Sequence, residues 1–269
     1  MKKAFVLFII ICILILGDNM IEALHNTLIF APTREFIATP DTEGINYEEV
    51  FIKTEDGETL YGYFLPYKDK TKNTILYLHG NADNISSWYT ACTEIQKKVP
   101  VNALVVDYRG YGKSTGSPTR IGVIKDAVAM YDFLIEKGYS NNEISIYGRS
   151  IGGAIGLELA KRKEVKSIVL QSSFTCIRDI AKDIYPIFPQ AIIKNDLLNS
   201  AQIIKGIKIP ILISHGALDE TVPVKHSYKL FELANEPKKL IILEGAGHND
   251  VASFFNKEYF DFLKELLTA

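Results

Sequence analysis

The sequence has few cysteines and no large excess of charge of either sign. Its three cysteines are Cys12, Cys92 and Cys176, and none belongs to a Cys-x-x-Cys pair. This spacing excludes a disulfide-rich scaffold and a thiolate zinc site, although a single Cys92–Cys176 bond stays open. The net charge of −2 and the lack of a long basic block argue against nucleic acid as a partner.

The sequence also lacks an apolar run of normal transmembrane length, although a shorter run stands at the N-terminus. Lys2 and Lys3 precede an unbroken apolar stretch from Ala4 to Gly17. As a helix it spans about 21 Å, less than a hydrocarbon core of about 30 Å. This length is typical of a signal peptide, but no small-x-small cleavage site follows.

We therefore predict that residues 1–24 form a single-pass membrane anchor. The lysines then stay cytoplasmic and the remaining domain, residues 25–269, is exported. The alternative is a cleaved signal segment, which would leave a secreted or periplasmic protein.

Beyond the N-terminal segment, strand and helix patterns alternate. Alternating apolar residues on either side of Asp56-Gly57 predict an antiparallel hairpin. The runs that follow predict strands at 73–79, 101–108, 143–148, 165–172, 209–216 and 238–245, and helices at 84–98, 121–138, 151–163, 224–234 and 251–267. Apolar strands that alternate with helices indicate an α/β fold, with a mostly parallel central sheet flanked by helices.

One connection between two of these strands is unusually long. Residues 173–208 exceed the usual combination of short loops and one helix. The segment carries bulky apolar residues at Tyr185, Ile187, Phe188, Ile192 and Ile193. We predict a short helical cap over a site, with an ordinary long crossover helix as the alternative.

Ser150 lies between Gly148 and Gly152, where an apolar strand run ends and a helical pattern begins. A Gly-x-Ser-x-Gly turn in this context is a nucleophile elbow, which exposes the serine at the carboxyl edge of the sheet. The turn is so sharp that side chains at the two glycine positions would collide. The pattern predicts Ser150 as a nucleophile, with a purely structural glycine-rich turn as the alternative.

A serine nucleophile needs a general base. In a fold with this elbow the acid and the histidine base follow the serine in the order Ser, Asp/Glu, His, so only residues after Ser150 are candidates. Of the five histidines, only His248 follows the last predicted core strand. Asp219, after the preceding strand, is the predicted acid that orients His248, and Glu220 is the weaker alternative. Asp250 is interpreted as the N-cap of the last helix and Asp107 as a loop-fixing residue.

The developing oxyanion needs backbone N–H donors. Ile151, the residue after the nucleophile, would supply one, and Asn81 in the "HGNAD" loop would supply the other. His79 is expected to pack behind this loop, and Arg149 is interpreted as a structural ion-pair partner. This chemistry requires no metal and no organic cofactor.

Together these motifs resemble the α/β-hydrolase superfamily. Its serine-aminopeptidase-like branch, with an N-terminal membrane segment, has the same order and spacing of "LYLHGNADN", "VVDYRGYGKSTGSPT", "YGRSIGG", "SHGALDETVP" and "GAGHND". The resemblance covers roughly residues 25–267, including "LIFAPTREF" at 28–36. It implies the α/β-hydrolase fold and a Ser-Asp-His triad that works through an acyl-enzyme.

The substrate class is open within this resemblance, because similar proteins include esterases, lipases, thioesterases and peptidases. The apolar residues of 173–208 and the lack of an acidic cluster favour acyl esters or thioesters, of lipid-like, small-molecule or acyl-protein substrates. The alternatives are a serine peptidase or aminopeptidase, and a catalytically silent scaffold that binds a lipid or a protein.

Overall fold

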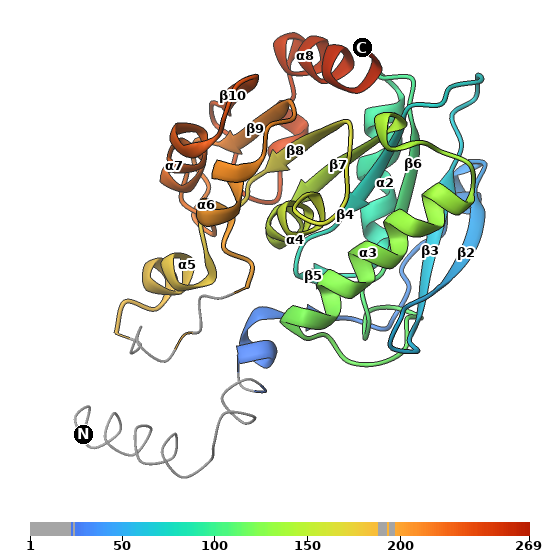
Figure 1. Ribbon diagram of the computed structural model, residues 1–269, viewed down its shortest axis with the longest axis horizontal. Coiled ribbons are helices and arrows are strands. Elements are labelled where there is room, and N and C mark those ends of the chain that lie inside the picture. Colours follow the sequence, from blue (N-terminus) through green and yellow to red (C-terminus); the bar gives the residue numbers. More distant parts are fainter. Residues whose placement is uncertain (1–22, 24, 188–192, 194–196) are drawn as a thin grey trace.

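A mostly parallel sheet forms the centre of the molecule (Figure 1). The computed structural model describes residues 23, 25–187, 193 and 197–269, and within them the main sheet has eight strands in the order β10-β9-β8-β7-β4-β6-β3-β2. The strands are β2 (Glu48–Lys53), β3 (Thr59–Leu65), β4 (Thr74–Leu78), β6 (Asn102–Val106), β7 (Ile144–Arg149), β8 (Ser167–Gln171), β9 (Ile211–Gly216) and β10 (Lys238–Leu243).

The antiparallel edge of the sheet is the predicted hairpin. β2 and β3 pair antiparallel and join through a turn in which Gly57 has a φ of +94°, a value that glycine adopts easily. β3 also runs antiparallel to β6, and all the remaining pairs are parallel. Every residue of β4, β6, β7, β8 and β9 is buried, which explains why apolar residues predominate in these strands.

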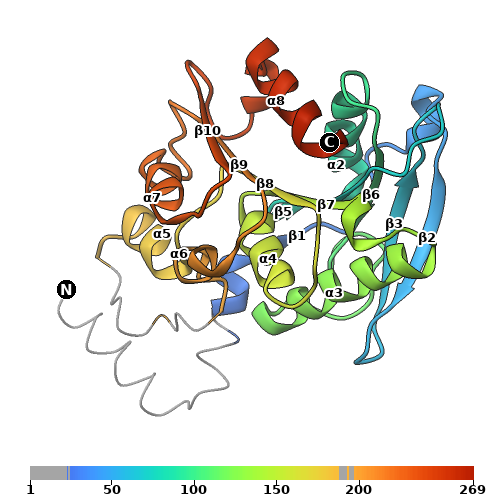
Figure 2. The same cartoon turned by 45° about the horizontal axis from the view of Figure 1, so that its top comes forward.

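Helices cover both faces of the sheet (Figure 2). They are α2 (Ile85–Gln96), α3 (Arg120–Glu136), α4 (Ile151–Ala160), α5 (Ile177–Ile184), α6 (Ser200–Ile203), α7 (Lys225–Leu233) and α8 (Lys257–Thr268). The buried side chains of α2 and α8 share one apolar core, and those of α3, α4 and α7 share the other. Alternate residues of a strand feed the two cores: Leu104 and Val106 of β6 enter one, while Ala103 and Val105 enter the other.

The C-terminal helix differs from the expectation over 251–267. A short 3-10 turn, η5 (Val251–Phe254), is separated from α8 because Asn256 caps α8 and accepts a hydrogen bond from Tyr259 N (2.9 Å). The interpretation of Asp250 as the cap of this helix is therefore wrong. Its Oδ1 instead accepts from Gly247 N (2.7 Å), which shapes the preceding loop.

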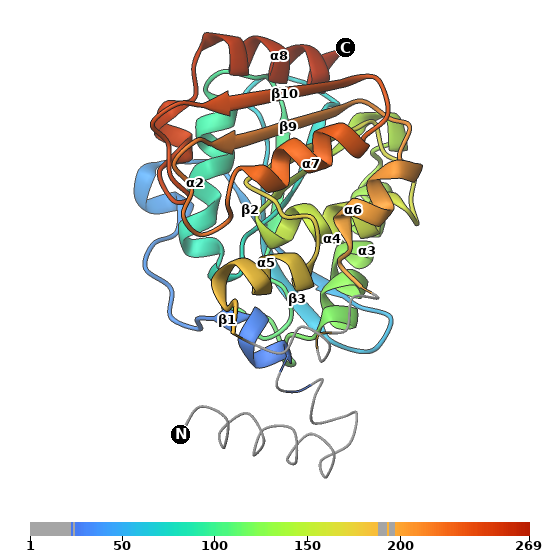
Figure 3. The same cartoon turned by 90° about the vertical axis from the view of Figure 1, so that its left-hand side faces the viewer.

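The segment before the hairpin packs against the end of the sheet. Residues 25–29 are helical, and the chain then pairs β1 (Ala31–Pro32) with β5 (Ala82–Asp83) in a short parallel ladder. In Figures 1 and 3 the turn formed by residues 25–29 lies beside α5. This segment, for which the sequence predicts no helix or strand, thus borders the carboxyl edge of the sheet.

Two other sequence expectations concern the N-terminus and the cysteines. Over the part of the chain that the structure describes, no helix is both long and apolar enough to cross a bilayer. The apolar run Ala4–Gly17 lies outside the described residues, as do Phe188 and Ile192 of the expected cap. Cys92 and Cys176 are both buried and form no disulfide, so the bond left open above is absent.

Candidate active site

Ser150 stands in a sharp turn between β7 and α4. Its φ of +53° and ψ of −119° are strained for a residue with a side chain. A Cβ at Gly148 would lie 2.5 Å from Gly152 O, and one at Gly152 would lie 2.0 Å from Leu78 O of β4. The two glycines are therefore required by close backbone contacts, one within the elbow and the other with the neighbouring strand.

His248 and Asp219 meet at the end of the neighbouring strands. His248 Nδ1 lies 2.7 Å from Asp219 Oδ2, while Asp219 Oδ1 accepts from Thr221 N (2.9 Å) and Val222 N (2.7 Å). These backbone donors leave the other carboxylate oxygen aimed at the imidazole. The pair has the geometry in which a carboxylate fixes the tautomer and orientation of a histidine base.

A second histidine, which sequence reasoning missed, also contacts Asp219. His215 Nε2 lies 3.1 Å from Asp219 Oδ2 and 2.7 Å from Val222 O, and Nδ1 lies 2.6 Å from Ser227 Oγ. Because the carbonyl can only accept, Nε2 carries the hydrogen and Nδ1 accepts from the Ser227 hydroxyl. His215 is fully buried, so it acts as a fixed donor behind the carboxylate.

These contacts determine the ionisation of Asp219. Burial by itself raises the pKa of this carboxyl, but hydrogen bonds from His215 and His248 outweigh it and hold the pKa well below its usual value. The residue is therefore a carboxylate at neutral pH. A carboxylate is the form that stabilises an imidazolium at His248.

Arg149 ties the elbow to the histidine loop. One guanidinium nitrogen donates to His248 O (2.6 Å), and Cζ lies 5.4 Å from the centroid of the Trp88 ring. Among the described residues no carboxylate forms a salt bridge with Arg149, so the predicted ion pair is replaced by these two contacts. The buried arginine thus places His248 beside the elbow.

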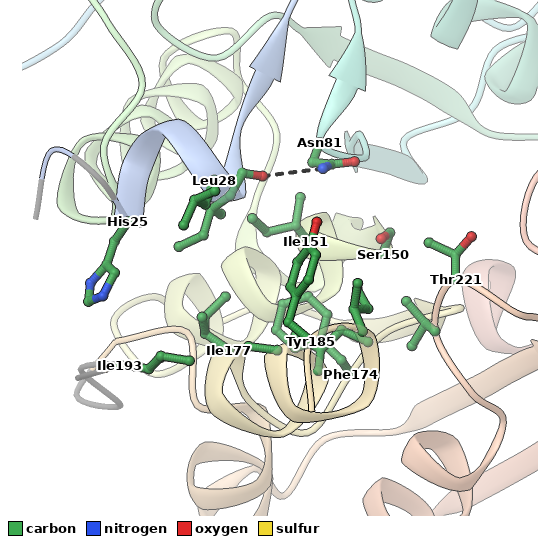
Figure 4. A pocket seen from close by; sticks show the side chains of 15 residues that line it. His25, Leu28, Asn81, Ser150, Ile151, Phe174, Ile177, Tyr185, Ile193 and Thr221 are labelled. Carbon is green, nitrogen blue, oxygen red and sulfur yellow. Dashed lines mark hydrogen bonds between the residues drawn. The ribbon is translucent and has the colours of Figure 1, made fainter. Parts of the chain in front are cut away.

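Ile151 and Asn81 flank the same space as Ser150 (Figure 4). Ile151 is the first residue of α4, so its N–H has no acceptor within the helix. Asn81 belongs to an anchored loop, since its carbonyl accepts from Ala31 N (3.0 Å) and Tyr111 Oη (2.7 Å). Its side-chain amide donates to the carbonyl of Ile29 (3.2 Å).

The loop that carries Asn81 is also supported from behind. His79 is fully buried, its Nδ1 donates to Gly80 O (2.7 Å), and burial lowers its pKa to about 4. Asp107 Oδ1 accepts from Ile85 N (2.8 Å) at the start of α2, which agrees with its predicted loop-fixing role. Neither group is exposed toward Ser150, so both contribute to structure rather than to proton transfer.

A cavity of about 340 Å³ opens beside Ser150, and its walls are mainly apolar. The helical turn 25–29 supplies Leu28 and Ile29, and α5 supplies Ile177, Ile180, Ala181 and Ile184. Tyr185 and Ile193 of the expected cap complete this side (Figure 4). The space suits an apolar chain attached to a carbonyl at Ser150.

Comparison with known proteins identifies the family. A family profile described as the alpha/beta hydrolase fold matches residues 73–196. Protein bem46 of Schizosaccharomyces pombe is 30% identical over 244 residues, which cover 87% of this chain and 81% of that protein. The alpha/beta hydrolase domain-containing protein WAV2 of Arabidopsis thaliana is also 30% identical over 244 residues, which cover 82% of this chain and 79% of that protein. The chain belongs to the α/β-hydrolase superfamily.

Solved structures agree with this assignment at the level of the fold. An esterase of Pyrococcus furiosus superposes with a TM-score of 0.73 at 21% identity, covering 89% of this chain and 97% of that one. An α/β hydrolase of Vibrio vulnificus superposes with a TM-score of 0.74 at 22% identity, covering 93% and 95%. The central sheet and its helices are thus those of the α/β-hydrolase fold.

Proposed function

We propose that this α/β hydrolase is a serine hydrolase that cleaves acyl esters or thioesters. The observation that carries the proposal is the position of Ser150, in a strained elbow at the wall of an apolar cavity. The hydrogen bond between His248 and Asp219 supports it, because it prepares a base next to the elbow. Ser150, Asp219 and His248 are the three residues that the sequence predicts as nucleophile, acid and base.

In the proposed reaction, Ser150 Oγ attacks the acyl carbonyl while His248 Nε2 takes the hydroxyl proton. Asp219 holds His248 Nδ1–H and stabilises the imidazolium. The N–H groups of Ile151 and Asn81 stabilise the oxyanion. His248 then donates its proton to the departing alcohol or thiol, and a water molecule activated by His248 releases the acid and restores Ser150.

The cavity favours esters over peptides with a free amino terminus. An aminopeptidase binds a substrate ammonium group through carboxylates, but the lining residues that the structure describes include neither Asp nor Glu. The silent-scaffold alternative leaves the strained elbow without a function. A serine peptidase stays the alternative reading, in keeping with the serine-aminopeptidase-like branch that the motifs resemble.

Two further parts of the proposal concern the regions around this site. We propose that residues 173–208 act as its cap, since α5, Tyr185 and Ile193 form one side of the cavity. We also propose that residues 1–24 anchor the protein in a membrane, with residues 25–269 exported. This rests on the N-terminal lysines and apolar run in the sequence.

The test combines a fluorophosphonate probe with a substrate series. The purified protein should react with the probe at Ser150 and hydrolyse p-nitrophenyl esters with kcat/KM rising from acetate toward medium chains. Each methylene buried in the cavity contributes about 0.8 kcal/mol, so each should raise kcat/KM several-fold until the space is filled. A maximum at acetate would contradict the apolar acyl site, and faster cleavage of aminoacyl anilides would restore the peptidase alternative.

A further inference from the structure

The mouth of the cavity is formed by exposed apolar side chains. Leu28, Ile184 and Tyr185 line the cavity and yet are 58%, 47% and 60% exposed. Ile187 lies two residues after Tyr185, outside the described lining of the cavity, and is 79% exposed. We call these four residues the apolar rim. A group of large apolar side chains around an opening is typical of a surface that meets a membrane or a partner.

The rim does not belong to a loosely attached helix. The apolar face of α5 points into the cavity, while Asp183 on its other face lies 2.9 Å from His226 Nε2 and 2.5 Å from Lys225 Nζ. Arg178 donates to Ile193 O (2.8 Å). Arg178 and Asp183 thus hold α5 against the rest of the protein, and the rim stays exposed.

The N-terminal sequence indicates what covers this rim. The apolar run ends at Gly17, and His25 already lines the cavity eight residues later. Eight residues span at most about 28 Å when fully extended. If the run lies in a bilayer, the chain therefore tethers the cavity close to that bilayer, on the side where residues 25–29 and α5 lie together (Figure 3).

We propose that the apolar rim docks into the acyl region of a phospholipid bilayer, and that the substrate is an acyl lipid that enters the cavity directly from it. Apolar side chains that insert at a membrane interface gain the transfer of their surface from water. The claim that the substrate is an acyl lipid rests on the proposed function above. Docking needs no catalysis, so docking and substrate entry can be tested separately.

Docking is tested with a fluorescent bimane label in the full chain, carrying Cys12→Ser and Ser150→Ala. One variant adds Ile187→Cys in the rim, and the matched control adds Phe51→Cys, since Phe51 is 64% exposed on β2. Both are reconstituted in phosphatidylcholine vesicles with brominated acyl chains. The label at position 187 should be quenched by the brominated lipid and the label at 51 should not.

Two outcomes of this experiment overturn the docking proposal. Equal quenching at positions 187 and 51 would show that the rim does not insert. The label at 187 could instead be shielded from a water-soluble quencher but not quenched by bromine. Energy transfer between two labelled copies would then show that a second protein chain covers the rim.

Entry of substrate from the bilayer is tested with the active full chain. Ile187→Lys should lower hydrolysis of a long-chain ester in vesicles about five-fold or more, because a charge resists insertion. Hydrolysis of soluble p-nitrophenyl butyrate should stay within about two-fold, and Phe51→Lys should change neither rate. Equal losses on both substrates would overturn entry from the bilayer. If the wild type cleaves no ester at all, the proposed function fails, while the quenching result still decides docking.

Discussion

Replacing Gly152 by alanine should damage catalysis more than folding. The new Cβ would lie 2.0 Å from Leu78 O, 2.6 Å from Leu78 C and 2.7 Å from His79 O. All three atoms belong to the backbone of β4 and the loop after it, so no rotamer change can relieve the contact. Because Cβ atoms essentially never approach closer than 3.0 Å, α4 and β4 must separate by at least 1.0 Å (3.0 minus 2.0).

This displacement acts on the groups that must meet at the carbonyl. Ser150 and Ile151 move with α4, whereas Asn81 stays with the loop after β4. A misplacement of about 1 Å can lower a rate about 10²-fold, so we expect kcat/KM to fall by about that factor. Overpacking costs about 1–3 kcal/mol of stability, and the melting temperature should fall by about 2–12 °C.

The assay pairs p-nitrophenyl butyrate hydrolysis with thermal unfolding, and Gly206→Ala is the control. Gly206 has open space around it and no positive φ, so its alanine variant should keep both the rate and the melting temperature. A Gly152→Ala protein with wild-type kcat/KM would refute the reasoning, since it would mean that the elbow can shift without disturbing the reaction.

The remaining predictions concern the three proposed catalytic residues. Ser150→Ala should abolish turnover and fluorophosphonate labelling with an unchanged melting temperature; residual turnover above a trace would rule out Ser150 as the nucleophile. Asp219→Asn should lower kcat by about 10³-fold or more, whereas Glu220→Gln should change it little. A large loss in Glu220→Gln with a small loss in Asp219→Asn would show that Glu220 is the acid. Hydrogen bonds hold the pKa of Asp219 below that of the unfolded chain, so its carboxylate stabilises the fold above about pH 4 and this contribution is lost on further acidification. Urea unfolding should therefore show the stability difference between wild type and Asp219→Asn shrinking from pH 5 to pH 2, and a constant difference would contradict this.

The sheet could be predicted from sequence because its strands are buried on both faces. Runs such as "TILYL" at 74–78 have no charged residue, and they alternate with helical patterns along the chain. The predicted ends of helices and strands differ from the observed ends by a few residues. The largest difference is at the start of α8, which Asn256 caps. There the helical pattern continues through a position whose side chain caps a new helix, a local competition that periodicity does not register.

The rest of the site depends on contacts between distant residues. His215 is one residue of a fully buried strand, and only the return of the loop after β9 places it behind Asp219. The turn 25–29 reaches the cavity because β1 pairs with β5, a ladder of two residues per strand that leaves no recognisable pattern. The contacts of Arg149 could not be predicted for the same reason: over the part of the chain that the structure describes, they come from Trp88 and the His248 loop instead of from a carboxylate.

Reaction and substrate are therefore encoded in different ways. The proposed catalytic groups stand where strands end, and a parallel sheet brings all such ends to one edge whatever the loops contain. Six of the described residues that line the cavity and carry apolar side chains come from residues 25–29 and from α5, which lie outside that sheet. Substitutions in these two segments can change the acyl group that fits without moving Ser150, His248 or Asp219. A motif can thus indicate the chemistry, whereas the packing of these two segments around the cavity is seen only in the folded chain.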